Sequence, residues 1–108
     1  MENTLTKEEF MLLAMLYVAN ADGKVSSDEV REMVDHFDTK TVADVRRLFN
    51  TMNDAAVLRC LSENKHHIAD NEADRSKLLA DLRGIVEADG RRSPMEEYVL
   101  HAVEQLLQ

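Results

Sequence analysis

Residues 21–29 read A-D-G-K-V-S-S-D-E and join two segments in which apolar residues recur at helical spacing. Gly23 is suited to the left-handed end of a helix, because it has no Cβ to clash there. Ser26 and Glu29 then match a capping box, in which each side chain accepts a hydrogen bond from the other residue's backbone N–H. This stretch therefore predicts a helix, a sharp elbow and a second helix.

A second elbow repeats the pattern near the other end of the chain. Residues 88–96 read A-D-G-R-R-S-P-M-E, so both copies fit A-D-G-[KR]-x-S-x-x-E. Ser93 is the expected N-cap here, and Pro94 the first helical residue, where its missing N–H costs nothing. Neither copy has the alternating acidic residues that an EF-hand calcium loop needs before its glycine. The internal repeat predicts two related helix–elbow–helix units.

Helical patterns extend from the elbows over the rest of the chain. Thr6 and Glu9 form another capping box, and residues 38–40 look like a break between two helices. We expect helix starts at Thr6, Ser26, Thr41, Asn53 or Asp54, Asp70–Asn71 and Ser93. The fourth helix either frays near Asn64 or continues through Ile68. Because glycine and proline are few and no strand-like alternation occurs, we predict an all-α, compact bundle of about six or seven helices, forming a single domain over residues 1–108.

Composition excludes several classes of function. The 108 residues carry 13 Lys and Arg against 21 Asp and Glu, a net charge of −8, which disfavours a nucleic-acid partner. The single cysteine, Cys60, excludes an internal disulfide. No apolar run approaches the roughly 18–20 residues that cross a bilayer. Residues 1–4 are acidic where a signal peptide is basic, so we expect a cytoplasmic protein without membrane insertion, although a membrane-associated complex stays open.

Two aspartates fit the local helix pattern less well. Asp22 and Asp89 come at helix C-termini, where the macrodipole disfavours a carboxylate by a few tenths to about 1 kcal/mol. Three compensations are open: N–H groups of the following helix, the neighbouring Lys24 or Arg91, or a bound cation.

The paired elbows resemble the TerB-like family, which includes the tellurite-resistance protein TerB and a segment of certain membrane-anchored J-domain co-chaperones. The resemblance covers nearly the whole chain. It implies an all-helical domain in which pseudo-symmetry brings the elbows together and a cluster of acids binds a metal ion. Carried over to this chain, the acids are Asp22, Glu29, Asp89 and Glu96. All-oxygen ligation favours Mg²⁺ or Ca²⁺ over Zn²⁺. Arg92 departs from the pattern, since an apolar residue is commoner there.

Other polar and apolar residues have simpler interpretations. His66 and His67 are adjacent, so we expect them to point to different sides of a solvated helix end. Cys60 is expected to be a half-buried small hydrophobic residue. Six methionines are expected mainly to fill the core or its boundary. The buried face predicted for the last helix consists of Tyr98, Val99, Ala102, Val103 and Leu106.

These observations favour a non-catalytic TerB-like module with a protein partner. The leading hypothesis is a stress-response scaffold of the tellurite-resistance type, with a divalent-cation site at the elbows. The alternative is a protein–protein interaction adaptor without metal, in which the elbows are purely structural. A small hydrolase that uses paired carboxylates is the least favoured interpretation, because no set of pocket-lining residues accompanies them. The pattern specifies neither a particular partner nor an oligomeric state.

Overall fold

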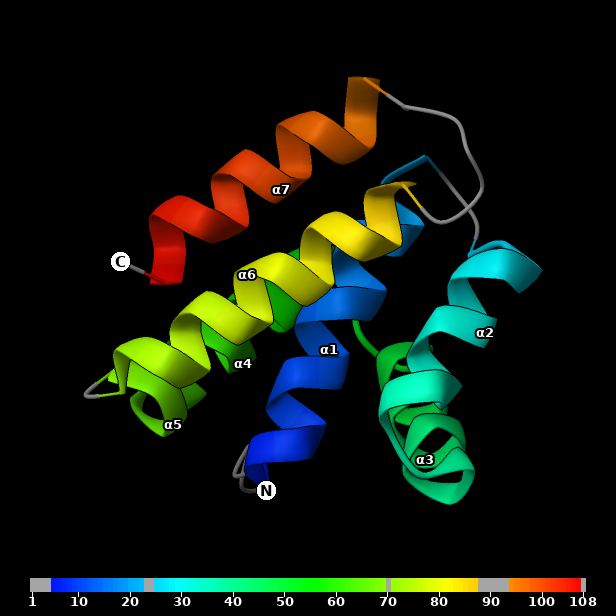
Figure 1. The fold of residues 1–108 in the computed structure, drawn as a ribbon, viewed down its shortest axis with the longest axis horizontal. Helices are drawn as coiled ribbons and strands as arrows, with labels where there is room; N and C mark the ends of the chain where they lie inside the picture. Colours follow the sequence, from blue (N-terminus) through cyan, green and yellow to red (C-terminus); the bar gives the residue numbers. More distant parts are fainter. Residues whose placement is uncertain (1–4, 23–24, 70, 88–93, 108) are drawn as a thin grey trace.

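Every regular element that the structure describes is helical, which confirms the all-α prediction (Figure 1). This computed structural model describes residues 5–22, 25–69, 71–87 and 94–107. Within those ranges it has seven α-helices and one short 3-10 helix. In chain order they are α1 (Lys7–Ala19), η1 (Asn20–Asp22), α2 (Ser27–His36), α3 (Thr39–Phe49), α4 (Asp54–Asn64), α5 (His66–Ala69), α6 (Glu72–Glu87) and α7 (Pro94–Leu107).

Helix α1 is the centre of the bundle and packs against α3, α4, α6 and α7. It begins with the predicted capping box of Thr6 and Glu9. A helix that is apolar on all sides is a buried helix, and α1 fits that rule more fully than the predicted stripe did. Its buried residues are Phe10, Met11, Leu12, Leu13, Ala14, Met15, Leu16, Val18 and Ala19. The α-helix ends at Ala19, and η1 continues the chain to Asp22 as a tighter last turn.

Helices α6 and α7 pack against each other beside α1, as Figure 1 shows. Arg83 of α6 forms ion pairs with Glu97 at 3.9 Å and Glu104 at 3.4 Å, both on α7. The predicted buried face of α7 is partly wrong. Val103 is buried, but Tyr98 is 72% exposed and Leu100, which the prediction omitted, is buried. Apolar residues occur on several sides of this helix, so sequence periodicity did not define its orientation.

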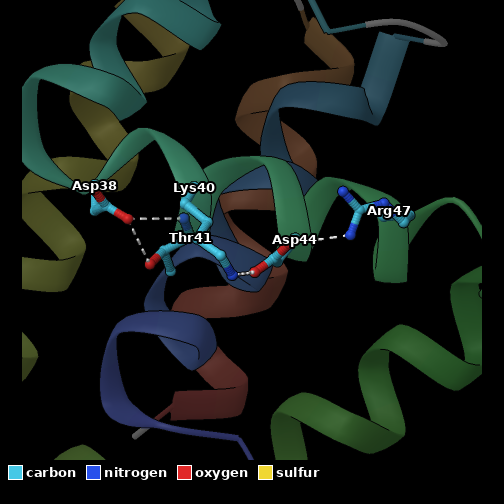
Figure 2. A network of polar contacts seen from close by, with 5 residues as sticks. All are labelled: Asp38, Lys40, Thr41, Asp44 and Arg47. Carbon is cyan, nitrogen blue, oxygen red and sulfur yellow. Dashed lines mark hydrogen bonds and ion pairs between the residues drawn. The ribbon is translucent and has the colours of Figure 1, made fainter.

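The predicted start of the third helix at Thr41 is also wrong. Helix α3 begins at Thr39, with Asp38 as its N-cap. Figure 2 shows the arrangement: one carboxylate oxygen of Asp38 accepts from the backbone N–H of Thr41 at 3.2 Å and from its hydroxyl at 3.4 Å. Aspartate is among the preferred N-cap residues, so residues 38–40, interpreted as a break, form the helix start instead.

Other helix starts agree with the sequence. The Asn53 side chain caps α4 by accepting from the backbone N–H of Ala56 at 2.8 Å. Asn71 accepts in the same way from Asp74 at 3.0 Å, at the start of α6. Pro94 is the first residue of α7, while its expected cap, Ser93, lies outside the described residues. Side chains at helix starts satisfy N–H groups that have no partner within the helix, which is why these boundaries could be predicted.

Candidate functional site

Glu29 is the elbow acid whose side chain the structure describes. Its Oε1 accepts a hydrogen bond from the backbone N–H of Ser26 at 2.8 Å, and the Ser26 hydroxyl accepts from the backbone N–H of Glu29 at 3.1 Å. This is the complete capping box that the sequence predicts. Glu29 is only 2% exposed, which is unusual because charged residues are rarely fully buried without a partner. Helix capping therefore accounts for one of its carboxylate oxygens.

The other three predicted metal ligands lie partly or wholly outside the described residues. Asp22 is the last residue of η1, and Glu96 is in the first turn of α7. The backbone of both is described, but their side chains are not. Asp89 lies outside the described residues altogether. The oxygen–oxygen distances among the four acids are therefore not part of the described structure.

The elements that carry the two elbows lie together at one end of the bundle. Element η1, in the first elbow, packs against α7, which follows the second elbow. Ala21 of η1 and Met95 of α7 line the same surface hollow of about 200 Å³. Figure 1 shows that the C-terminal ends of α1 and α6 and the start of α7 are at the same end of the molecule. The described helices thus bring the sequence neighbours of Asp22 and Glu96 close together.

The chemistry of the elbow acids fits a hard cation. An ionised carboxylate has about four lone-pair sites, so the capping bond to Ser26 does not use up the capacity of Glu29. Mg²⁺ and Ca²⁺ both prefer oxygen ligands of this kind. Within the part of the chain that the structure describes, no group of three or more His, Cys, Asp or Glu side chains is arranged to hold a metal ion.

A buried polar cluster near the N-terminus was not predicted. The backbone N–H of Leu5 donates to Asn64 Oδ1 at 3.0 Å, and the Leu5 carbonyl lies 2.6 Å from His67 Nε2. Asn64 also donates to the Cys60 carbonyl at 2.9 Å. Buried backbone groups must be hydrogen-bonded, so these side chains hold Leu5 onto the α4–α5 region. No sequence signal indicated this contact, because Leu5 is 59 positions from Asn64.

The histidine and cysteine predictions need correction at this cluster. The rings of His66 and His67 lie 4.4 Å apart between centroids, so they do not point to different sides. The His67 ring is also 6.0 Å from the Phe10 ring and is half-buried, whereas His66 is exposed, as expected for a solvated helix end. Cys60 is buried, not half-buried. Burial and then the charge of Glu63 raise the pKa of the Cys60 thiol, which favours the unreactive thiol form.

Exposed apolar side chains are concentrated on α7. Among the described residues, the large hydrophobic side chains that remain exposed are Met95, at 53%, and Tyr98, at 72%. The predicted core positions of Met11, Met15 and Met33 are confirmed. None of the helices that the structure describes is long and apolar enough to cross a bilayer.

Comparison with known proteins agrees with the family resemblance. The family model described as tellurite resistance protein TerB matches residues 8–108, a span that contains both elbows and all four predicted acids. Neither the curated proteins nor the solved structures gave a match. Since the family model covers nearly the whole chain, this chain belongs to the TerB family.

Proposed function

We propose that this TerB-family chain is a non-catalytic scaffold that binds a divalent cation at its two elbows and acts in a stress response of the tellurite-resistance type. The observation that carries the proposal is the packing of η1 against α7, which supports a shared site for acids from both elbows. The ligands would be Asp22, Glu29, Asp89 and Glu96, and the ion Mg²⁺ or Ca²⁺. A cytoplasmic setting and a protein partner are part of the proposal.

The role proposed for the cation is to neutralise the repulsion among the elbow acids. Four carboxylates that converge repel one another unless they are protonated, paired or metal-bound. A cation bound between the elbows would neutralise the acids and join the α1–α2 unit to the α6–α7 unit. Since it would bind the folded chain, it would also stabilise the fold by about 2.7 kcal/mol at a concentration of 100 times Kd.

Calorimetric titration with Mg²⁺, Ca²⁺, Mn²⁺ and Zn²⁺ tests the site. We expect binding heat and a rise in Tm with Mg²⁺ or Ca²⁺, and loss of both in Asp22→Asn and Glu96→Gln. Glu29→Gln should also weaken binding but keep the helix cap, because glutamine serves in a capping box. Glu9→Gln is the matched control, since Glu9 forms the same box in α1, away from the elbows. Absence of heat and of a thermal shift with every ion would refute the cation site.

The alternative is an adaptor in which the elbows are purely structural. The capping bonds of Glu29 favour it, because they explain this residue without a metal. An adaptor of this kind predicts that the double variant Asp22→Asn, Asp89→Asn captures the same proteins from a bacterial lysate as the unmodified chain. Loss of captured proteins in that variant, with unchanged Tm in the absence of metal, would favour the cation-dependent scaffold instead.

A further inference from the structure

Helix α7 has apolar side chains that are not buried in the core. Its core contacts come from the opposite side, where Leu100 and Val103 are at most 1% exposed. Met95, Tyr98 and Ala102 are all exposed, and their spacing of three and four residues puts them on one face of the helix. Exposed apolar side chains that lie together on one face form the kind of surface at which a partner can bind.

A hollow adjoins this apolar face and extends it. It measures about 200 Å³ and is lined by Tyr17, Asn20, Ala21, Asp54, Met95 and Val99. The lining residues come from α1, η1, α4 and α7, so packed helices form the walls. Met95 belongs both to the hollow and to the exposed face of α7. One partner segment could therefore cover the face and insert a side chain into the hollow.

The polar groups of the hollow favour a positively charged side chain of a partner. Among the residues that the structure describes, Asp54 is the only charged residue of the lining, and it forms no ion pair with any of the others. Asp44 on α3, by contrast, is paired with Lys40 and Arg47. Burial and then the charge of Asp54 raise the pKa of Tyr17, so its hydroxyl remains a hydrogen-bond donor. A Lys or Arg of a partner would pair with Asp54 and lie near an aromatic ring, both favourable contacts.

We propose that the hollow and the Met95–Tyr98–Ala102 face, together called the α7 docking surface, bind a basic amphipathic peptide segment of a partner protein. An apolar side chain of the segment fills the hollow, and a Lys or Arg pairs with Asp54. The net charge of −8 favours approach of such a segment over long distances. The inference rests on the scaffold role proposed above and does not require the cation.

A second acidic region of the surface provides a comparison. A hollow of about 350 Å³ lies next to the start of α1 and is lined by residues that include Glu8, Glu9 and Asp38. Glu9 and Asp38 already cap α1 and α3, and among the described residues the exposed large hydrophobic side chains lie on α7 instead. Glu8 is exposed and can be neutralised without removing a cap, which makes Glu8→Gln the matched control for Asp54→Asn.

The test uses the full chain and a phage-displayed library of random short peptides as the probe. We expect enriched peptides to combine large apolar residues with Lys or Arg. Binding should weaken about tenfold in Asp54→Asn, as expected for loss of a charge-assisted hydrogen bond. It should weaken at least as much in Tyr98→Ser and change less than about twofold in Glu8→Gln.

Methyl NMR of ¹³C-labelled methionine locates the bound peptide. We expect the Met95 signal to shift on binding, while the signals of the buried Met11, Met15 and Met33 stay in place as internal controls. Enrichment of peptides without basic residues, or equal binding to Tyr98→Ser, would overturn the proposal. Sedimentation equilibrium gives a further check. If the unmodified chain forms a dimer and Tyr98→Ser is a monomer, the proposal is overturned, because a second copy of the chain would then be the occupant.

The cation proposal and this inference fail separately. Peptide binding that persists in EDTA, together with no heat from any metal ion, would remove the elbow site and leave the α7 docking surface. Cation binding with no peptide enriched over the Tyr98→Ser control would remove the docking surface alone.

Discussion

Helices α1 and α2 begin with the same capping box in different surroundings. Glu9 Oε1 accepts from the Thr6 N–H at 2.8 Å, and Glu29 Oε1 accepts from the Ser26 N–H at the same distance. The reciprocal bonds are 3.2 Å and 3.1 Å long. However, the bonds of the first box are exposed, whereas Glu29 is 2% exposed. Local sequence thus determines the hydrogen bonds, and tertiary packing determines how far the carboxylate is removed from water.

The largest predicted effect comes from removing the buried glutamate, Glu29. Glu29→Ala should destabilise the chain by about 2 kcal/mol, because it leaves the Ser26 N–H without its acceptor in a partly buried site. Glu9→Ala should cost only about 0.5 kcal/mol, since water can replace the lost acceptor. Urea denaturation of both variants in metal-free buffer measures the difference. Equal midpoints would show that burial adds nothing to the capping bond of Glu29.

Both boxes could be predicted from sequence because a capping box is contained within four residues. The same is true of the Asn53 cap and of Pro94 at the start of α7. The burial of Glu29 could not be predicted, because it depends on how α2 packs against α1, α3 and α6. Sequence reasoning finds residues that bond to near neighbours and misses the surroundings that distant segments provide.

The candidate sites show the same division. The elbow acids come from the family resemblance and stay a prediction, whereas the packing of η1 against α7 is seen only in the fold. Apolar residues occur around α7, so the sequence places Tyr98 in the core. Its exposure depends on which side of α7 faces the other helices, and that is seen only in the fold. The bonds of Leu5 to Asn64 and His67 join distant segments, so no local pattern could reveal them.

The cap of α3 extends the comparison to a helix start without a complete box. Asp38 accepts from the Thr41 N–H, but position 41 is a threonine, so no glutamate returns the bond. Asp38→Ala should destabilise the chain by about 1 kcal/mol, as is typical for loss of an N-cap. Asp38→Asn is the control and should change stability by less than about 0.5 kcal/mol, because asparagine caps equally well. Chemical denaturation measures both. If the two variants are equally destabilised, the charge of Asp38 matters more than its hydrogen bond.

Gly84 tests how closely α2 lies against α6. A Cβ added at Gly84 would lie 3.4 Å from Oε2 of Glu32, a flexible side chain one turn after Glu29. Since this is an ordinary contact and alanine favours helix, Gly84→Ala should raise stability by about 0.5 kcal/mol. Thermal and urea denaturation measure the gain. If Gly84→Ala lowers stability and the double variant with Glu32→Ala regains it, the result would show instead that α2 cannot move away from α6.

The smallest effect on stability is expected at Asp44. This acid accepts hydrogen bonds from two side chains and does not cap a helix. Hydrogen bonds from Lys40 and then from Arg47 lower the pKa of Asp44, and Figure 2 shows both partners on α3. An acid whose pKa is lower in the folded state stabilises the fold above its unfolded pKa, and that contribution is lost as the pH falls. Asp44→Asn should therefore lose less stability than the unmodified chain between neutral and acidic pH. Urea midpoints at both pH values measure this. Asp28→Asn is the control, because among the described residues Asp28 pairs with Arg31 alone, at the longer distance of 3.4 Å. If the unmodified chain and Asp44→Asn lose the same stability on acidification, solvent screening cancels the bonds of Asp44 to Lys40 and Arg47. The side chains that cap backbone N–H groups would then be the polar groups that stabilise the start of α3.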